Sequence, residues 1–259
     1  MSVPTFLRPV AYYWSAYKRT WKSQLSDVLV GPLLYLASLG VGLGSLVGHG
    51  HRLASLGGQD YLSFVAPALL ATTAMQMALV LSTWEIFAYV SPWNGAYRSM
   101  QTSPISVQGI VVGQLTWIVL RVELASAAYL LVSAAFGAVH SPYALGALVV
   151  GPLVGLAFGA PTAAYSVTVR HDQPLVLIFR LFMLPLFLFS GTFFPLSQLP
   201  VGLRYVAYAL PLWHGVELSR SLYAGHLGGD FVLHLAYLAA VAAIGTVVAG
   251  ATYARRLAR

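Results

Sequence analysis

The sequence predicts an all-α integral membrane protein, and its composition and the spacing of its apolar residues carry this prediction. Of the 259 residues, 58% are hydrophobic and only 8% are charged, whereas a soluble domain uses about 25% charged residues. The apolar residues gather in runs of about 20, the length that a helix needs to cross the hydrocarbon core of a bilayer. The basic residues lie at the chain ends and between these runs rather than in one patch, which argues against nucleic-acid binding.

Six apolar runs predict six transmembrane helices in one domain that covers residues 1–259. In chain order the runs are 28–47, 61–84, 104–139, 143–169, 174–194 and 231–254. Ser103-Pro104 and Ser141-Pro142 each place an N-cap residue before a proline at the first helical position. Gln173-Pro174 supplies the proline alone. These starts therefore rest on capping as well as on hydropathy.

Lysine and arginine set the predicted orientation, because they are enriched in the cytoplasmic loops of membrane proteins. With the N-terminus inside, the outer segments hold only Arg52, Arg204 and Arg220, whereas the inner segments hold Arg8, Lys18, Arg19, Lys22, Arg98, Arg170, Arg255, Arg256 and Arg259. We therefore expect both termini in the cytoplasm. Arginine outnumbers lysine twelve to two and alanine and glycine abound, which is typical of a GC-rich bacterial genome and favours a bacterial plasma membrane.

Residues 1–23 predict an amphipathic helix that lies in the cytoplasmic interface of the membrane. One face at helical spacing carries Phe6, Val10, Tyr13, Tyr17 and Trp21, and another carries Arg8, Ser15, Arg19 and Lys22. Aromatic side chains suit the lipid boundary and cations suit the head groups. Two roles stay open: a passive anchor, or a helix that also contacts a cytoplasmic partner.

A second short helix is expected over residues 91–103, between the second and third spans. Serine followed by proline is a typical helix start, and Pro104 would end the helix. Because two spans can be joined by a few residues, a rigid helix here suggests a docking element for a partner. An interfacial helix that rests on lipid is the alternative. The residues assigned to contact with a partner are Ser91, Pro92, Trp93, Tyr97, Arg98 and Met100.

Residues 191–229 predict a hairpin on the outer side that dips back toward the membrane. Pro195, Pro200 and Pro211 divide it into two short helices. Glu217 and Arg220 are three positions apart, so they can pair, which lowers the cost of holding charge near lipid. Broken helices at membrane depth are tolerated where they are buried in protein or line a cavity. The pattern favours a pathway or its lid over an ordinary outer loop.

Charges inside the spans are the other candidate functional groups. Arg121 and Glu123 interrupt the third run. A charge at mid-bilayer costs at least ~2.5 kcal/mol, so each should face the bundle or a cavity. Because they are two positions apart they point to different sides, and structural pairing and substrate contact stay open for both. Arg180, about two turns into the fifth run, can extend its head group to the cytoplasmic side.

The sequence gives little support to catalysis or metal binding. It has no G-x-x-x-x-G-K-[ST] phosphate-binding loop and no cysteine, so it predicts neither a nucleotide site of this type nor a thiolate metal site. His49 and His51 lack acidic partners at ligand spacing. His140, His226 and His234 are expected to be isolated, in loops or at the interface. We expect no metal and no cofactor in this chain.

Three segments carry a resemblance to a known family. They are FVAPALL at 64–70, LFSGTFFPLSQLP at 188–200 and PLWHGVELSR at 211–220. With the order of predicted elements, they make the chain resemble the ABC-2 type permeases over nearly its whole length. Within that family it is most similar to the nodulation-factor (lipo-oligosaccharide) exporter permease and the daunorubicin-type permeases. Residues 84–95 depart from the family, which usually has more charge around the inner helix.

The resemblance implies a permease that works with a separate ATP-binding cassette subunit. That partner would bind ATP and Mg, and the full transporter would hold two permeases and two ATPases. The two permeases would be identical or similar chains that meet through the first and fifth spans. Glycines at positions 40, 44 and 48 suit such close packing. The residues expected at this interface or along the pathway are Gly40, Leu43, Gly44, Pro185, Phe187, Phe193 and Phe194.

The expected function is export of an amphipathic or hydrophobic molecule, because the first and fifth spans offer mostly apolar side chains. The resemblance allows both a drug-like compound and a lipid-linked saccharide. Two other classes stay open. An ion-coupled secondary transporter would rely on Glu123, and a membrane-embedded lipid-modifying enzyme would need a convergent set of histidine and acidic residues.

Overall fold

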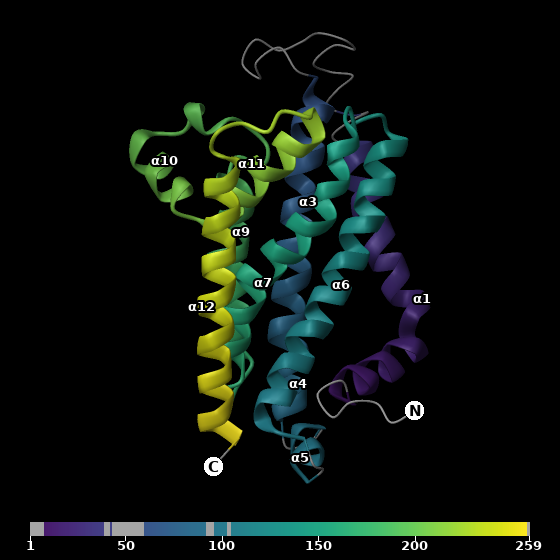
Figure 1. Cartoon of the computed structure of the whole chain (residues 1–259), viewed down its shortest axis with the longest axis vertical. Coiled ribbons are helices and arrows are strands. Elements are labelled where there is room, and N and C mark those ends of the chain that lie inside the picture. Colours follow the sequence, from purple (N-terminus) through teal and green to yellow (C-terminus); the bar gives the residue numbers. More distant parts are fainter. Residues whose placement is uncertain (1–7, 39–41, 43–59, 92–95, 103–104, 258–259) are drawn as a thin grey trace.

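The computed structural model describes every residue except 1–7, 39–41, 43–59, 92–95, 103–104 and 258–259. The described residues form helices and no strands, which confirms the all-α prediction (Figure 1). In chain order the elements are α1 (Arg8–Leu36), α3 (Tyr61–Val80), η4 (Leu81–Glu85), α4 (Ile86–Val90), α5 (Ala96–Gln101), α6 (Val107–Ala135), η5 (Pro142–Gly146), α7 (Ala147–Ser166), α8 (Gln173–Leu177), η6 (Ile178–Met183), α9 (Leu184–Phe189), η7 (Leu196–Gln198), α10 (Val201–Tyr208), α11 (Pro211–Ala224) and α12 (Phe231–Leu257).

Four helical stretches of the described chain are long and apolar enough to cross a membrane. They are Tyr61–Val90, Val107–Ala135, Pro142–Ser166 and Phe231–Leu257, and they correspond to the second, third, fourth and sixth predicted spans. The fifth predicted span is the shorter apolar helix Gln173–Phe189. The first lies partly in α1, and most of its remainder, with Gly40, Leu43 and Gly44, falls outside the described residues.

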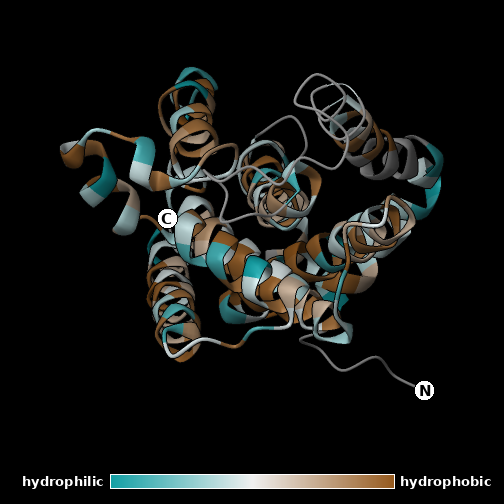
Figure 2. Cartoon of the chain, turned by 90° about the horizontal axis from the view of Figure 1, so that it is seen from above, coloured by the Kyte–Doolittle hydropathy of each residue, from teal (hydrophilic) through white to brown (hydrophobic). Residues whose placement is uncertain are grey.

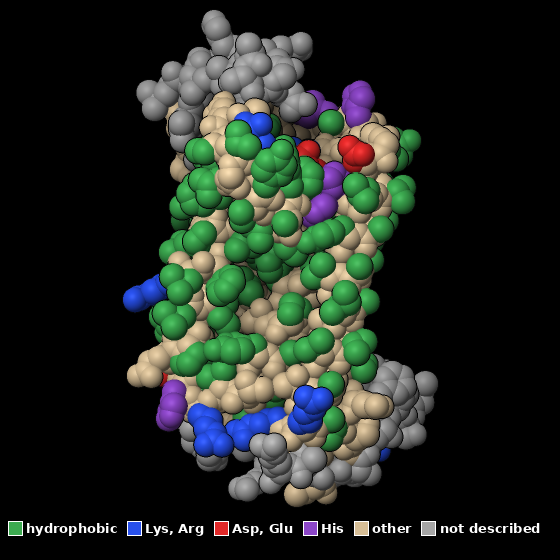
Figure 3. Space-filling model, turned by 90° about the vertical axis from the view of Figure 1, so that its left-hand side faces the viewer, with side chains coloured by type: hydrophobic (Ala, Val, Ile, Leu, Met, Phe, Trp, Pro, Cys, Tyr) green, Lys and Arg blue, Asp and Glu red, His purple; other side chains and the backbone are tan. Residues whose placement is uncertain are grey.

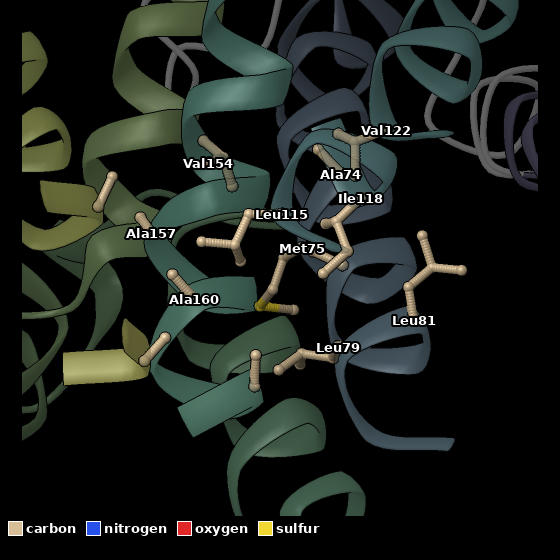
Figure 4. Packing of buried hydrophobic residues seen from close by; sticks show 14 of the residues in the cluster. Ala74, Met75, Leu79, Leu81, Leu115, Ile118, Val122, Val154, Ala157 and Ala160 are labelled. Carbon is tan, nitrogen blue, oxygen red and sulfur yellow. The ribbon is translucent and has the colours of Figure 1, made fainter. Parts of the chain in front are cut away.

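The long helices pack around α7, whose small residues let its neighbours approach closely. A Cβ atom added to Gly151 would meet the Ser126 hydroxyl of α6, and one added to Gly155 would lie 3.0 Å from Val122. The glycine and alanine spacing in α7 therefore serves packing within this subunit. Figure 4 shows the result, with Val154, Ala157 and Ala160 of α7 facing side chains of α3 and α6.

The sides of the bundle carry many exposed apolar side chains. Figure 2 shows hydrophobic residues on the outward-facing sides of the helices as well as between them. Large apolar side chains such as Leu131, Val149 and Val247 are more than half exposed. A helix that is hydrophobic all round suits a membrane and not a water-facing surface. Basic side chains gather at the lower end of the molecule (Figure 3), where α1 begins and α12 ends (Figure 1).

The structure shows how the third and fourth predicted spans begin. Ser141 is the N-cap of η5 as predicted, and its hydroxyl accepts a hydrogen bond from the Tyr143 amide at 3.2 Å. The third span begins at Val107, three positions after Pro104, which lies outside the described residues. Its N-cap is Ser106, whose hydroxyl accepts a hydrogen bond from the Gly109 amide at 3.1 Å. The oxygen of Ser106 thus satisfies one of the free amides of the first helical turn.

The N-terminal segment also differs from the prediction. α1 continues without a break from Arg8 to Leu36, and it runs across the lower end of the bundle before it turns upward (Figure 1). Part of the face assigned to lipid packs inward instead. Tyr13 is buried, and its ring lies 5.3 Å from that of Tyr89 and 6.0 Å from that of Trp117, whereas Trp21 of the same face is exposed. The helix is therefore fastened to the bundle by aromatic contacts.

Candidate functional site

α5 lies at the lower end of the molecule and is anchored by a buried tyrosine. Tyr97 is 1% exposed. Its hydroxyl donates to the Gln114 side-chain oxygen of α6 at 3.2 Å and lies 3.4 Å from the Tyr253 hydroxyl of α12. Its ring also packs 5.7 Å from that of Tyr89 at the end of α4. We call the aromatic residues around it the inner aromatic cluster: Tyr13, Tyr17, Tyr89, Tyr97, Trp117 and Tyr253.

The residues predicted to contact a partner divide into several groups. Tyr97 and Met100 are buried in the core of this chain, so their side chains do not offer the exposed docking face expected for them. Ser91 ends α4, and its hydroxyl donates to the Phe87 carbonyl at 2.6 Å. Pro92 and Trp93 fall outside the described residues, as does the Arg98 side chain. An apolar stripe on a helix predicts burial, but in this case the burial is against the chain's own helices.

Arg121 is buried beside the inner aromatic cluster. It is 5% exposed, and its guanidinium lies 4.7 Å from the centre of the Tyr17 ring and 5.7 Å from that of Trp117. Such cation–π contacts stabilise a desolvated arginine. Arg121 also interacts electrostatically with Glu85. The neighbouring charge, Glu123, is only half-buried, so the two predicted charges do occupy different surroundings.

Glu85 is an acidic residue of the bundle that the apolar runs do not predict. The second run ends at residue 84, so the pattern places this carboxylate beyond the span. The structure extends the helix to Val90 through the π-helical turn η4, and this places Glu85 inside the bundle. A signal was present, because apolar residues continue at 86–90 after the single acidic residue. The aromatic stack of Trp84 on Phe179, at 6.2 Å, joins this turn to the second π-helical turn, η6.

At the upper end, Arg220 of α11 joins three segments. It pairs with Glu217 at 3.0 Å, which confirms the predicted pairing. Its guanidinium also donates to the Gly191 carbonyl at 2.5 Å and to the Phe64 carbonyl at 3.3 Å, and it lies 3.8 Å from the centre of the Phe64 ring. Gly191 has a φ of +79°, which glycine adopts without strain. The three segments that carry the family resemblance therefore meet at this arginine.

The hairpin that Arg220 closes begins beside α1 and α9. Phe193 packs 4.8 Å from Phe187, and Phe187 lies 6.2 Å from Tyr35 of α1. Thr192 and Thr72 are hydrogen-bonded at 3.3 Å. The predicted prolines do precede helical segments: Pro195 precedes η7, Pro200 precedes α10, and Pro211 starts α11. Of the predicted pathway residues, Phe187, Phe193 and Phe194 thus lie near the upper end, where α9 leads into the hairpin.

A histidine pair, which the sequence pattern does not predict, attaches the hairpin to α12. The Nδ1 atoms of His214 and His234 are 2.8 Å apart, and His214 Nε2 lies 3.1 Å from the Tyr208 carbonyl. A carbonyl can only accept, so His214 Nε2 donates, and its Nδ1 accepts from His234. The expectation that His234 is isolated is therefore wrong, because its partner lies on a different helix, twenty positions away.

Burial lowers the pKa of His214. It falls from its ordinary 6.5 to about 4, with burial as the main cause and the nearby His234 as the second. The ring stacks on Tyr237, 3.9 Å between centres, and the Tyr237 hydroxyl donates to the Ala209 carbonyl at 2.6 Å. Two histidines do not make a metal centre here: within the described ranges, no three histidine, cysteine or acidic residues gather in a way that would hold a metal ion.

The sequence of the chain matches one protein family. Residues 10–224 match the sequence profile described as ABC-2 type transporter. Among curated proteins, the chain is similar to nodulation protein J of Rhizobium leguminosarum bv. trifolii, with 30% identity over 94% of this chain and 90% of that protein. It is 30% identical to nodulation protein J of Sinorhizobium fredii, over 94% and 90%. With that of Bradyrhizobium diazoefficiens it shares 29% identity over 96% and 95%.

Proposed function

Because the chain belongs to the ABC-2 type transporter family and is its membrane-embedded permease subunit, we propose that it exports an amphipathic or hydrophobic molecule. The family implies a separate ATPase subunit that supplies the energy. In the proposed assembly, two such ATPases drive two permeases, and the whole of this chain acts as one membrane domain. The ATPase partner, and not this chain, binds ATP and Mg.

The observation that carries the coupling part of this proposal is the position of α5. It lies at the end of the molecule where α1 begins and α12 ends (Figure 1), and Tyr97 fastens it to α6 and α12. Its Ser99 side chain is exposed, as is that of Thr102 just beyond it. In this proposal the lower end is cytoplasmic, the exposed side of α5 contacts the ATPase, and the buried side transmits force into the bundle. The gathering of basic side chains at this end supports that orientation.

The helix Gln173–Phe189 supports both the assembly and the kind of cargo. Its Leu181 and Phe182 are 63% exposed, and none of the residues of η6 is buried. Its ring contacts reach Tyr35 of α1, through Phe187, and Trp84 of η4, through Phe179. A helix that leaves large apolar side chains exposed suits a permease–permease contact and an amphipathic cargo that moves along it. The resemblance to lipo-oligosaccharide exporters extends the proposal to a lipid-bearing saccharide, with a drug-like compound as the other cargo class.

Reconstitution with the ATPase tests the function. Purified permease and ATPase are placed in liposomes, and hydrolysis of ATP is measured with and without candidate lipo-oligosaccharides and hydrophobic drugs. We expect a cargo-stimulated rate and ATP-dependent uptake into inside-out vesicles, whose exposed face is cytoplasmic. Uptake that follows an ion gradient and ignores ATP would instead support the secondary transporter.

The proposed contact between permeases is tested separately. The chain has no cysteine, so single cysteines at Leu43, Leu181 and Phe187 act as unique probes. Cross-linked dimers through these positions would support a contact that uses the first and fifth spans. If cysteine at the exposed Val149 of α7 cross-links and the other three do not, the contact lies elsewhere.

A further inference from the structure

Tyr97 is the side chain of α5 whose hydroxyl reaches both α6 and α12. The helix has only six residues, so its backbone contacts are few, and among described elements they involve α4 and α6. The Tyr97 hydroxyl donates to Gln114 of α6, which leaves the Tyr253 hydroxyl of α12 to donate to Tyr97. Their rings lie 5.9 Å apart. A single buried hydroxyl therefore links this short helix to two long ones.

α11 and the outer hairpin are attached to the same two helices at their other ends. His234 of α12 donates to His214 of α11 across 2.8 Å. The Ser133 hydroxyl of α6 is hydrogen-bonded to the Tyr223 hydroxyl of α11 at 2.9 Å. On α6 the contacts are at Gln114 and Ser133, and on α12 they are at His234 and Tyr253. In each helix the two contacts are separated by 19 positions, or roughly 29 Å at 1.5 Å per residue.

α6 and α12 are also the unbroken helices among the four candidate spans. α3 contains Pro67 and leads into the π-helical turn η4, and α7 contains Pro152 and Pro161. α6 and α12 contain no proline and remain α-helical from end to end. Prolines and π-turns are the usual places where a helix bends. A displacement applied at one end of α12 is therefore transmitted to the other end with less bending than in α3 or α7.

We propose that α12 is a rigid connection between α5 and the outer hairpin, with Tyr253 and His234 as the positioning residues at its two ends. When the ATPase displaces α5, the Tyr97–Tyr253 contact moves α12, and the His234–His214 contact carries that movement to α11 and α10. This proposal rests on the proposed function, because it takes α5 to be the element that the ATPase moves. It adds residues on the last helix that neither local sequence nor the family resemblance assigns to coupling.

The test measures movement of α10 in the complex of the permease with its ATPase. A single cysteine at Leu203, an exposed residue of α10, reacts with a maleimide that does not cross the membrane. Its labelling rate is compared without nucleotide and with ATP plus vanadate. Tyr253→Phe removes one hydroxyl and keeps the ring, and His234→Leu removes the donor to His214. Each should reduce the nucleotide-dependent change in rate by about five-fold, as expected when a hydrogen bond is lost.

The double variant distinguishes one connection from two local effects. Substitutions at independent sites this far apart have additive effects. Substitutions at the two ends of one connection do not, so adding Tyr253→Phe to the His234→Leu protein should not reduce the nucleotide-dependent change in labelling rate any further. His234→Asn, whose amide can donate from nearly the same place, should restore most of the response. Tyr165→Phe, at an exposed tyrosine of α7, is the matched control and should leave the nucleotide-dependent change in labelling rate as in the wild type.

Four outcomes overturn the proposal. An undiminished response in Tyr253→Phe, or additive losses in the double variant, would show that α12 does not carry the movement, while the function as a permease would stand. A wild-type complex that hydrolyses ATP without any change at Leu203 would also overturn it. A wild-type chain that neither binds an ATPase nor responds to nucleotide would overturn the proposed function together with this connection.

Discussion

The guanidinium of Arg220 lies 3.8 Å from the centre of the Phe64 ring and donates to the Phe64 carbonyl, although the two residues are 156 positions apart. This contact joins α11 to the beginning of α3. The same guanidinium holds the Gly191 carbonyl and pairs with Glu217, so a single side chain closes the hairpin on the bundle. An arginine with several directed partners is not replaceable by a simple cation.

Removing this contact should open the hairpin. We expect Arg220→Lys to lower the melting temperature, because lysine keeps the charge and loses the fork that reaches both carbonyls. Arg220→Met should cost more, since it leaves two carbonyls and Glu217 without this partner. Glu217→Gln, at a half-exposed site, should have the smallest effect and should lower export without preventing assembly. Thermal unfolding in detergent ranks the three, and equal melting temperatures would contradict the role of Arg220.

The close packing of α7 on α6 gives a second prediction. Gly151→Ala should destabilise the protein by about 1–3 kcal/mol, the usual cost of overpacking a core, because its new methyl group would meet the Ser126 hydroxyl. Ser126→Ala removes that oxygen and should recover part of the loss. Gly250→Ala in α12, where nothing lies within 4 Å, is the control and should be neutral or stabilising. The measurement is unfolding in a mixed-detergent titration, and a Gly151→Ala protein as stable as the control would refute the packing argument.

The two sides of α5 should respond differently to substitution. Tyr97→Asp places a carboxylate at a buried site, so it should reduce the amount of folded protein. Ser99→Arg changes the exposed side, so the permease should fold normally while hydrolysis by the ATPase loses its response to cargo. Insertion into membranes and stimulated ATP hydrolysis are measured for both variants. A poorly folded Ser99→Arg protein, or a fully functional Tyr97→Asp protein, would reverse this assignment.

Acid should weaken the outer hairpin through His214. The pKa of His214 is lowered from 6.5 to about 4, mainly by burial, so between these values the unfolded chain binds a proton that the folded chain does not. The contribution of His214 to the free energy of unfolding is therefore complete above pH 6.5 and is lost as the pH falls toward 4. Three described side chains pack on the His214 ring: His234, Tyr237 and Trp213. None of them is a carboxylate that would favour the charged form of His214.

The test of this pH dependence is a comparison with His214→Phe, which keeps a ring on Tyr237 and cannot titrate. Melting temperatures are measured between pH 4.5 and 7.5 for both proteins. The wild type should lose more stability on acidification than the variant does, and parallel pH profiles would show that His214 is not the group responsible.

Some features of this protein follow from local sequence. Apolar runs of membrane-spanning length predict the helices, the serine before Pro142 predicts a helix start, and the three-position spacing of Glu217 and Arg220 predicts their ion pair. The prolines at 195, 200 and 211 predict the division of the hairpin. Each of these depends on residues that are near one another in the chain, so that backbone geometry alone brings the groups together.

Only the tertiary structure decides which apolar faces are inside. In a soluble protein an apolar stripe identifies the core, but lipid is as apolar as a protein interior, so the pattern around Tyr13 or Tyr97 does not distinguish lipid or a partner from the chain's own helices. The structure buries both residues against neighbouring helices. It also brings together groups from distant segments, as in the contacts of Tyr97 with Tyr253 and of His214 with His234. These contacts depend on how the helices pack, a property of the whole bundle that no local spacing specifies.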